Sequence, residues 1–337
     1  MHSPSSGTRL GGSFSLTSRA VRYDGFTDQS MRERRGPMRT QQRLTEAYER
    51  ARVVPFTNDS RFVFISDCHR GTGSLADEFT RNENSYVHAL DYYYTNGFTY
   101  VEVGDGDELW EHSHFRHIKD AHYNAFDAVK RFHYDDRFIL IWGNHNNFLR
   151  DPEYVKENLH VYRDEYTGTT HPFLPGIDPC ESVVFIHETT GQEIVVLHGH
   201  QGDFANDQAW WPTMLAVRYF WRHVHGIGVR NPVSPVRNAY KRHKIERHFT
   251  KWIERHKRAL ICGHTHRFKY PRNGEQPYFN AGACVYPTKI TAVEVCDGTI
   301  ALVRWCIVAD GEGSLRVAKD VLWGPDPIEK FDMRQDL

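Results

Sequence analysis

The stretch Arg61-Phe62-Val63-Phe64-Ile65-Ser66-Asp67-Cys68-His69 decides how this 337-residue chain folds. Its apolar run is too short for a helix and is built from β-branched and aromatic residues, which is typical of a buried strand. We therefore predict a strand over Arg61–Ser66. An aspartate and a histidine follow at once, so the strand delivers two polar side chains to one edge of a sheet.

The same arrangement recurs four times further along the chain. Strands are predicted at Tyr100–Val103, Arg137–Trp142, Ile194–Leu197 and Ala259–Cys262. The loops that follow them read Gly104-Asp105-Gly106-Asp107-Glu108, Gly143-Asn144-His145-Asn146, His198-Gly199-His200 and Gly263-His264-Thr265-His266. Short buried strands that open into polar loops and alternate with helices are typical of α/β enzymes. The predicted fold class is therefore α/β.

Other segments complete the secondary structure. One helix is expected to begin near Ser74 and Asp77 and to end at Asn96-Gly97, where the turn signal lies. A second is expected over Lys241–Arg258, where Ile245, Phe249, Trp252 and Ile253 form an apolar stripe. A basic helix is expected over Arg39–Arg52. The segments Tyr278–Asn280, Thr291–Val295 and Thr299–Val303 are expected to be antiparallel strands.

These elements suggest two parts. Residues 1–58 are expected to be an N-terminal tail with the basic helix, and residues 59–337 the main domain, with a basic helical cap at about 204–258. Residues 1–22 contain six Ser, three Arg and no acid, without the apolar core of a secretory signal. The tail is interpreted as disordered, with an organelle transit peptide as the alternative.

Composition excludes several classes of protein. Lys and Arg number 42 against 43 Asp and Glu, and the mean hydropathy is −0.63. The longest purely apolar runs, such as Phe138–Trp142, are five residues long, whereas a membrane-spanning helix needs about 20. Six cysteines without a CxxC pair argue against a disulfide scaffold or a structural zinc knuckle and favour a reducing compartment, the cytoplasm.

The polar loops carry the side chains that bind first-row transition metals. Glycines at 104, 143, 199 and 263 allow each turn to bring a ligand forward without a Cβ clash. Seven candidate ligands are too many for one ion and suit two ions that share a carboxylate. They are Asp67, His69, Asp105, Asn144, His198, His264 and His266, with His145 and His200 in reserve.

This ordered motif series resembles the calcineurin-like metallophosphoesterase superfamily over roughly residues 60 to 305. Within that superfamily, the segment Gly104–Trp110 and the helical insertion are similar to the branch that contains UDP-2,3-diacylglucosamine pyrophosphatases. The resemblance implies a four-layer αββα sandwich of two mixed β-sheets flanked by helices, with a helical cap insertion and the site at the strand ends.

The resemblance also implies roles for the candidate residues. Asp67, His69 and His266 would hold one metal, Asn144, His198 and His264 the other, and Asp105 would bridge them. His145 would be the catalytic histidine. His198 is preferred to His200 because the family's ligand precedes a glycine, which leaves His200 to face the substrate or to support a ligand.

The implied activity is hydrolysis of a phosphoester or pyrophosphate bond by a hydroxide that bridges two divalent metal ions. Manganese is the first expectation, with iron or zinc as alternatives. His145 would stabilise a phosphate oxygen or protonate the leaving group. Ser/Thr phosphoprotein phosphatase, cyclic-nucleotide phosphodiesterase and nuclease activities remain alternatives within the same chemistry.

One position departs from the family pattern. Asn146 stands where the family usually has Asp or Glu after Gly-Asn-His, and a neutral amide stabilises an imidazolium less than a carboxylate does. Slower turnover or a shifted pH optimum is the expected consequence, unless Asp107 or Glu108 orients His145 instead.

The cap indicates the substrate class. Between Phe204 and Arg258 there are twelve Lys or Arg and three acids, with Trp and Phe interleaved. Such a cap suits a large phosphorylated anion, linked to a nucleotide or a lipid, or a nucleic acid. Candidate substrate residues are His200, Arg218, Arg222, Arg237 and Lys241.

Two alternatives stay open. The basic residues are equally typical of a solvated helix face, with the tryptophans in the core. A binding protein that retains the metals but has attenuated catalysis, and that holds nucleic acid or an anionic surface, is the second class of function. The sequence does not indicate an oligomeric state.

Overall fold

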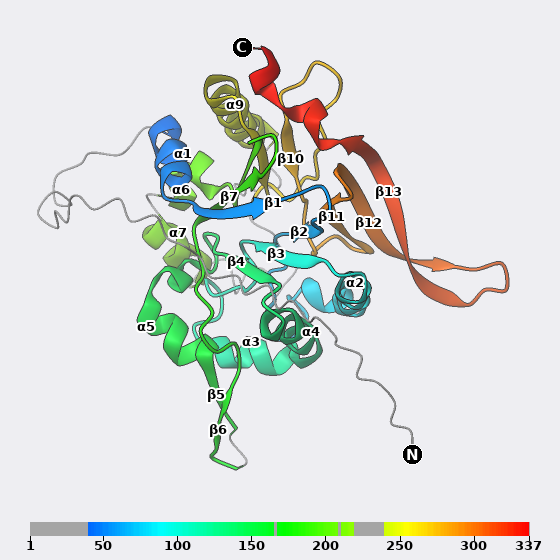
Figure 1. Ribbon diagram of the computed structural model, residues 1–337. Coiled ribbons are helices and arrows are strands. Elements are labelled where there is room, and N and C mark those ends of the chain that lie inside the picture. The colour runs from blue at the N-terminus through cyan, green and yellow to red at the C-terminus, as the bar shows by residue number, and fades with distance from the viewer. Residues whose placement is uncertain (1–39, 165–166, 208–209, 219–238, 337) are drawn as a thin grey trace, which may run out of the picture. The chain divides into compact units, whose positions relative to one another are not determined.

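The computed structural model describes residues 40–164, 167–207, 210–218 and 239–336. The expectations for the N-terminal tail, and those for Arg222 and Arg237, lie outside these residues. The described chain forms two large mixed β-sheets and a set of helices (Figure 1). None of the described helices is both long enough and apolar enough to cross a membrane.

The first sheet has five strands in the order β1-β7-β8-β9-β10. The strands are β1 (Arg52–Phe56), β7 (Ser182–His187), β8 (Glu193–Leu197), β9 (Ala259–Cys262) and β10 (Tyr278–Asn280). Only the β7–β8 pair is antiparallel.

The second sheet has six strands in the order β13-β12-β11-β2-β3-β4. The strands are β2 (Phe62–Ile65), β3 (Thr99–Val103), β4 (Phe138–Ile141), β11 (Lys289–Cys296), β12 (Thr299–Ala309) and β13 (Leu315–Pro327). Strands β2, β3 and β4 are parallel, whereas β11, β12 and β13 are added to β2 in antiparallel fashion. A separate small hairpin joins β5 (Val161–Arg163) to β6 (Thr170–Pro172).

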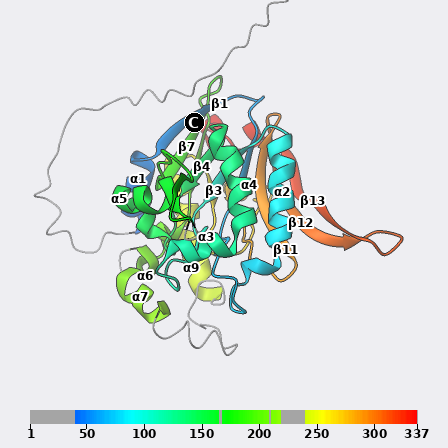
Figure 2. The ribbon, with the colours of Figure 1, turned by 90° about the horizontal axis from the view of Figure 1, so that it is seen from below.

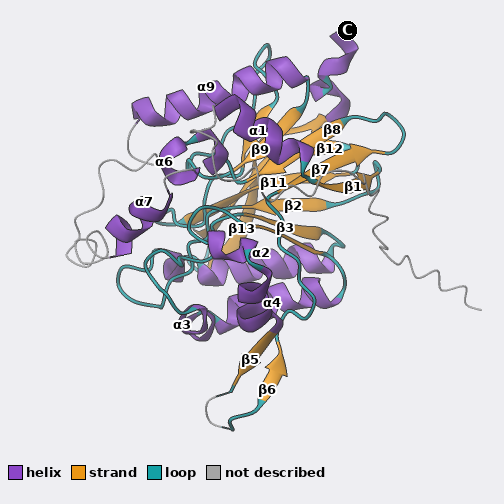
Figure 3. Cartoon of the chain, turned by 90° about the vertical axis from the view of Figure 1, so that its left-hand side faces the viewer, coloured by secondary structure: helices purple, strands orange, loops and turns teal. Residues whose placement is uncertain are grey.

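Helices cover the outer faces of both sheets. The described α-helices are α1 (Thr40–Glu49), α2 (Glu83–Thr95), α3 (Phe115–Ala121), α4 (Tyr123–Tyr134), α5 (Pro152–Val155), α6 (Phe204–Asp207), α7 (Trp210–Ala216) and α9 (Ala239–His256). Helices α2 and α4 pack on the six-stranded sheet, and α1 and α9 pack on the five-stranded sheet. The strands lie between these two groups of helices (Figure 3).

An apolar core joins the inner faces of the two sheets. Phe62 and Phe64 of β2 meet Phe185 of β7 at ring-centroid distances of 4.8 and 5.5 Å. Alternate residues of each strand point into this core, which is the pattern that two facing sheets require. The order of layers is therefore helix, sheet, sheet, helix, as expected for an αββα arrangement.

The five strands that precede the polar loops are confirmed within one or two residues at each end. The antiparallel expectation for Tyr278–Asn280 is wrong, because β10 pairs with β9 in parallel. Four described strands, β1, β5, β6 and β13, were not predicted from the sequence. Strand β1 pairs with β7, so the chain enters the sheet before residue 59.

The helix expected from Ser74 onward begins later. Helix α2 starts at Glu83 after a short 3₁₀ turn, Phe79–Arg81. The Asp77 carboxylate accepts hydrogen bonds from the backbone N–H groups of Gly71, Gly73 and Phe79, so it closes the preceding loop rather than capping α2. Helix α9 buries all four residues of its predicted stripe.

A buried histidine makes the stability of this fold depend on pH. His122 is fully buried between α3 and α4 and contacts Asp77 at 2.7 Å and Glu83 at 3.1 Å. Burial alone would lower the pKa of His122, but its bonds to Asp77 and Glu83 outweigh burial and raise it to about 9. The unfolded chain has the ordinary histidine pKa of about 6.5. Between pH 6.5 and about 9, the folded protein therefore holds a proton on His122 that the unfolded chain has released.

We therefore expect this contribution to stability to be complete below about pH 6.5 and to be lost as the pH rises through about 9. The measurement is the free energy of unfolding of the wild type and of His122→Gln between pH 6 and 9.5, by urea titration. The difference between the two proteins should shrink with rising pH. A constant difference would contradict the assignment of a charged His122.

Candidate metal centre

The predicted ligands lie at the carboxyl ends of five strands from both sheets. Asp67 and His69 follow β2, Asp105 follows β3 and Asn144 follows β4, all in the six-stranded sheet. The five-stranded sheet contributes His198 after β8 and His264 and His266 after β9. The site is thus built across the seam between the two sheets.

One group of potential ligands comprises Asp67, His69 and His266, whose ligand atoms all lie within 4.8 Å of one another. The Nε2 atoms of His69 and His266 are 3.0 Å apart, and Nε2 of His266 lies 3.0 Å from Oδ1 of Asp67. Oδ2 of Asp67 accepts hydrogen bonds from the Ser66 hydroxyl and from the backbone N–H of His264. These bonds leave Oδ1 to face the two imidazoles.

A second group comprises Asp105, His198 and His264 and obeys the same 4.8 Å limit. The Nδ1–H of His198 donates to the carbonyl of Val103 at 2.8 Å. This bond orients the ring and directs the Nε2 atom of His198 toward Asp105, whose Oδ2 is 3.0 Å away. Burial lowers the pKa of His264, which favours the neutral form that binds metals.

Asp105 lies between the two groups. Its Oδ1 accepts a hydrogen bond from the backbone N–H of His145 at 2.8 Å. Its Oδ2 is 3.0 Å from Nε2 of His198 and 3.9 Å from Nε2 of His69. A carboxylate in this place can contact ions held by either group.

The unpaired atoms of the site fit a metal. Among the described residues, four fully buried side-chain atoms at the centre have no hydrogen-bond partner: Asp67 Oδ1, Asn144 Oδ1, His198 Nε2 and His264 Nε2. An unpaired buried polar atom costs about 1–3 kcal/mol. These two oxygens and two imidazole nitrogens converge without hydrogen bonding to one another, and together they are ligand atoms that suit a divalent transition metal.

The backbone at the site is strained. Asp67, His69, Asp105, His264 and His266 all have positive φ, between 48° and 65°. Side-chain-bearing residues rarely adopt this conformation, which costs on the order of 1–3 kcal/mol each at such positions. Five of the seven predicted ligands share this conformation, so strain is concentrated where the ligands converge.

Glycines let neighbouring loops press against these ligands. A Cβ on Gly104 would lie 2.5 Å from the His198 ring, and one on Gly143 would lie 2.2 Å from Oδ1 of Asp105. A Cβ at either position would therefore displace a predicted ligand.

His145 is held by Glu108. Oε1 of Glu108 contacts Nδ1 of His145 at 2.7 Å, and Oε2 contacts Nδ1 of His69 at 2.8 Å. Burial alone would raise the pKa of Glu108, but the charges and hydrogen bonds of His145 and His69 hold it well below its usual range. The His145 ring stacks on Trp110 with centroids 4.3 Å apart, so two contacts fix its orientation.

The other two proposed partners of His145 are engaged elsewhere. The side chain of Asn146 accepts a hydrogen bond from the backbone N–H of Gly143 and so closes the turn. Asp107 pairs with the buried Arg70 at 2.8 Å, and Arg70 also makes a bidentate ion pair with Glu102. Of the three alternatives considered from the sequence, Glu108 is therefore the one that contacts His145.

Three predicted substrate residues lie within the described chain, and each has a structural contact. His200 is only 2% exposed and packs against Trp142, so it does not face solvent. The Arg218 guanidinium donates to the carbonyls of Leu109 and Trp110 at 2.8 and 3.0 Å. Arg218 thus ties the chain beyond α7 to the loop that carries Glu108.

Lys241 pairs with Asp203 at 2.8 Å. Asp203 in turn lies 3.7 Å from Nε2 of His264, so it is a further carboxylate beside the centre. Sequence reasoning missed Asp203, although it stands in the same loop as His198 and His200. Trp110 was also missed, since only the fold places it over His145.

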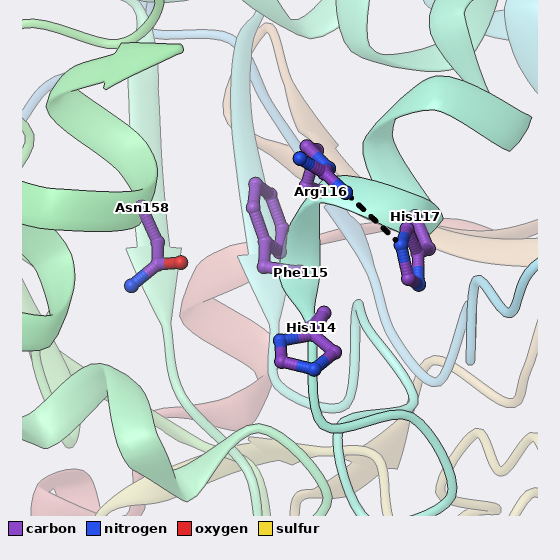
Figure 4. Close-up of a pocket in the computed structure, with 5 residues that line it drawn as sticks. All are labelled: His114, Phe115, Arg116, His117 and Asn158. Atoms are coloured by element: carbon purple, nitrogen blue, oxygen red, sulfur yellow. Dashed lines mark hydrogen bonds between the residues drawn. The ribbon is translucent and has the colours of Figure 1, made fainter. Parts of the chain in front are cut away.

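A separate hollow lies at the start of α3 and is lined by His114, Phe115, Arg116, His117 and Asn158 (Figure 4). A hydrogen bond of 3.4 Å joins Arg116 to His117 there. None of the predicted ligands lines this hollow. Comparison of the sequence with family models and with curated proteins found no match.

The unpaired donors predict that divalent metal stabilises the fold. We expect Mn²⁺ or Zn²⁺ to raise the melting temperature of the metal-stripped protein. When the free metal concentration is 100 times the dissociation constant, the free energy of unfolding should increase by about 2.7 kcal/mol. Asp105→Asn should abolish most of this rise, because the amide removes the charge shared by both groups. The measurement is thermal unfolding with and without metal, with the exposed Asp59→Asn as control. Equal stabilisation of both variants would contradict the ligand assignment.

Close packing of Gly143 against Asp105 gives a further prediction. Gly143→Ala should weaken metal binding by about 10–100-fold, since the added methyl group must move the Asp105 carboxylate. Gly311→Ala is the matched control, because a Cβ there meets no atom within 4 Å. Calorimetric titration with metal measures the affinity of both variants. Unchanged affinity in Gly143→Ala would show that the contact is unimportant.

Proposed function

We propose that this protein is a metal-dependent hydrolase of phosphoester or pyrophosphate bonds, of the calcineurin-like metallophosphoesterase type. One observation carries the proposal: two groups of His and Asp side chains converge across both sheets, with Asp105 between them. The helix-sheet-sheet-helix order of layers supports the same assignment.

The donor set fits two divalent ions. Asp67, His69 and His266 would hold one, Asn144, His198 and His264 the other, and Asp105 would contact both. When bound, such ions lower the pKa of a water and neutralise the oxygens of a phosphoryl group. Manganese, iron and zinc all suit this mixture of carboxylate, amide and imidazole donors.

The protein's own residues prepare the site for an anionic substrate. Burial alone would raise the pKa of Asp67 and of Asp105, but the surrounding imidazoles hold both well below the usual range, so both are carboxylates at neutral pH. Among the predicted ligands and His145, the most exposed side chains are imidazoles: His69, His145 and His266 are 13%, 22% and 14% exposed. A phosphate can therefore approach through the histidine side.

His145 is the residue placed to act on the substrate. Because Nδ1 faces Glu108, the opposite ring nitrogen, Nε2, is available to hydrogen bond a phosphate oxygen or to donate a proton to the leaving group. The Glu108 carboxylate holds Nδ1 of His145 at 2.7 Å and so fixes which ring nitrogen faces the substrate. Trp110 limits rotation of the ring.

This arrangement favours the enzyme over the binding-protein alternative. That alternative depended on the neutral Asn146, since an amide supports an imidazolium poorly. The contact between Glu108 and His145 supplies the missing carboxylate. No other observation on the described residues favours attenuated catalysis.

Hydrolysis of bis-p-nitrophenyl phosphate and p-nitrophenyl phosphate tests the proposal. The metal-stripped protein should be inactive, Mn²⁺ should restore turnover, and Asp105→Asn should remain inactive while Asp59→Asn behaves as the wild type. A nucleoside diphosphate ester, assayed in parallel, separates pyrophosphatase from phosphoesterase activity. Two metal equivalents without turnover on any of the three would overturn the enzymatic assignment.

Glu108 provides a second test. We expect Glu108→Gln to lower kcat by about 10–100-fold at saturating metal, because the amide keeps the shape of the side chain but not its charge. The measurement is kcat and KM across a pH range, together with metal content, which separates loss of His145 support from loss of the His69 contact. A fully metallated variant with wild-type kcat at every pH would contradict the role given to Glu108.

A further inference from the structure

Strand β13 forms a free edge of the six-stranded sheet. It is the terminal strand of that sheet, and its only strand partner within the described part of the chain is β12. The far end of the β12–β13 hairpin extends beyond α2 (Figures 1 and 2). A long edge strand exposes backbone N–H and C=O groups that can pair with another strand.

Exposed apolar side chains gather on this hairpin. Ile307, Leu315 and Val321 are 51%, 75% and 52% exposed. Cross-strand partners share a face, and the register pairs Val303 with Val321, Ile307 with Val317 and Ala309 with Leu315. The three exposed residues therefore lie on one face, which is the face that packs on α2 further along the sheet.

Two prolines restrict where this edge can pair. Pro325 and Pro327 have no N–H to donate, so the half of β13 that contains them is a poor partner for another strand. The half from Leu315 to Val321 contains no proline and no glycine. Pairing with another strand is therefore favoured there.

This half of β13 is complementary to itself in one antiparallel register. When two copies pair about a two-fold axis at Ala318, Leu315 of one faces Val321 of the other, and Arg316 faces Asp320. The first pair is apolar and the second is of opposite charge, and both combinations stabilise cross-strand contacts. The remaining pair joins Val317 to Lys319, which keeps its ion pair with Glu294. The small side chain of Ala318 sits at the axis, where two copies of the same residue must meet.

The charges are available for this pairing. Arg316 is exposed and has no ion-pair or hydrogen-bond partner among the described residues. Asp320 accepts from Arg304 through Oδ2 at 2.6 Å, which leaves Oδ1 for a second guanidinium. Side chains on that face alternate with the apolar ones, as a strand requires.

We propose that β13 pairs with β13 of a second copy of this chain, centred on Ala318, to give a symmetric dimer with a continuous sheet. A two-fold interface of this kind is self-complementary, because each residue pair occurs twice. The pairing joins two six-stranded sheets into one and sets Leu315 of each copy beside Val321 of the other. It does not depend on the proposed hydrolase activity.

Sedimentation velocity over a wide range of protein concentration tests the proposal. The wild type should form dimers, and Arg316→Asp, which places two carboxylates opposite each other twice, should weaken association by about tenfold or more. Combining Arg316→Asp with Asp320→Arg should restore it. Arg163→Asp, on the exposed strand β5, is the matched control and should dimerise normally.

A cross-link tests the register itself. Ala318→Cys, in a Cys306→Ser background that removes the cross-strand thiol, should form a disulfide-linked dimer under a mild oxidant. Directly opposed Cβ atoms lie about 4.5–5.5 Å apart, close to the spacing that a disulfide needs. Ser314→Cys should not cross-link, because its copies would lie far apart. A wild type that stays monomeric, or a dimer that Arg316→Asp and the cross-link leave unaffected, would overturn the proposal.

Discussion

The burial of two carboxylates is the constraint on which the rest of the site depends. Asp67 and Asp105 are at most 1% exposed, and a buried carboxylate is several kilocalories per mole less stable than in water unless opposite charge and hydrogen bonds compensate it. Backbone N–H groups take up one oxygen of each, and the imidazoles of His69, His198 and His266 face the other. These imidazoles come from both sheets. The two carboxylates are therefore compensated only when the two sheets pack face to face.

The cost of this arrangement is visible in the backbone. Asp67, Asp105 and His264 leave their strands through left-handed conformations that only a well-packed surrounding can maintain. Gly143 and Gly104 let the next loop approach within contact distance. The Glu108 carboxylate then connects His69 to His145, so the proposed catalytic histidine is positioned from the same centre. Function and strain are concentrated in the same few turns.

The sequence was most informative where a buried strand runs directly into a polar loop. The strands before Asp67, Asp105, Asn144, His198 and His264 were predicted because their short apolar runs are typical of buried strands and too short for helices. The ligands were then predicted from the polar loops that follow these strands. Strand β1 was missed because Pro55 interrupts its apolar run, and β13 was missed because it mixes charged and apolar residues and contains two prolines. The partner of His145 could not be chosen from the sequence, since Asp107, Glu108 and Asn146 differ only in where the fold directs their side chains. The hydrogen bonds from Arg218 to the carbonyls of Leu109 and Trp110 could not be predicted either, because no sequence pattern reveals which backbone carbonyls a guanidinium reaches.

Anomalous diffraction from crystals grown with Mn²⁺ tests the central claim most directly. The account predicts two peaks, one among Asp67, His69 and His266 and the other among Asn144, His198 and His264, with Asp105 in contact with both. Peaks elsewhere, or none at this seam between the sheets, would contradict the assignment of these residues as a metal centre.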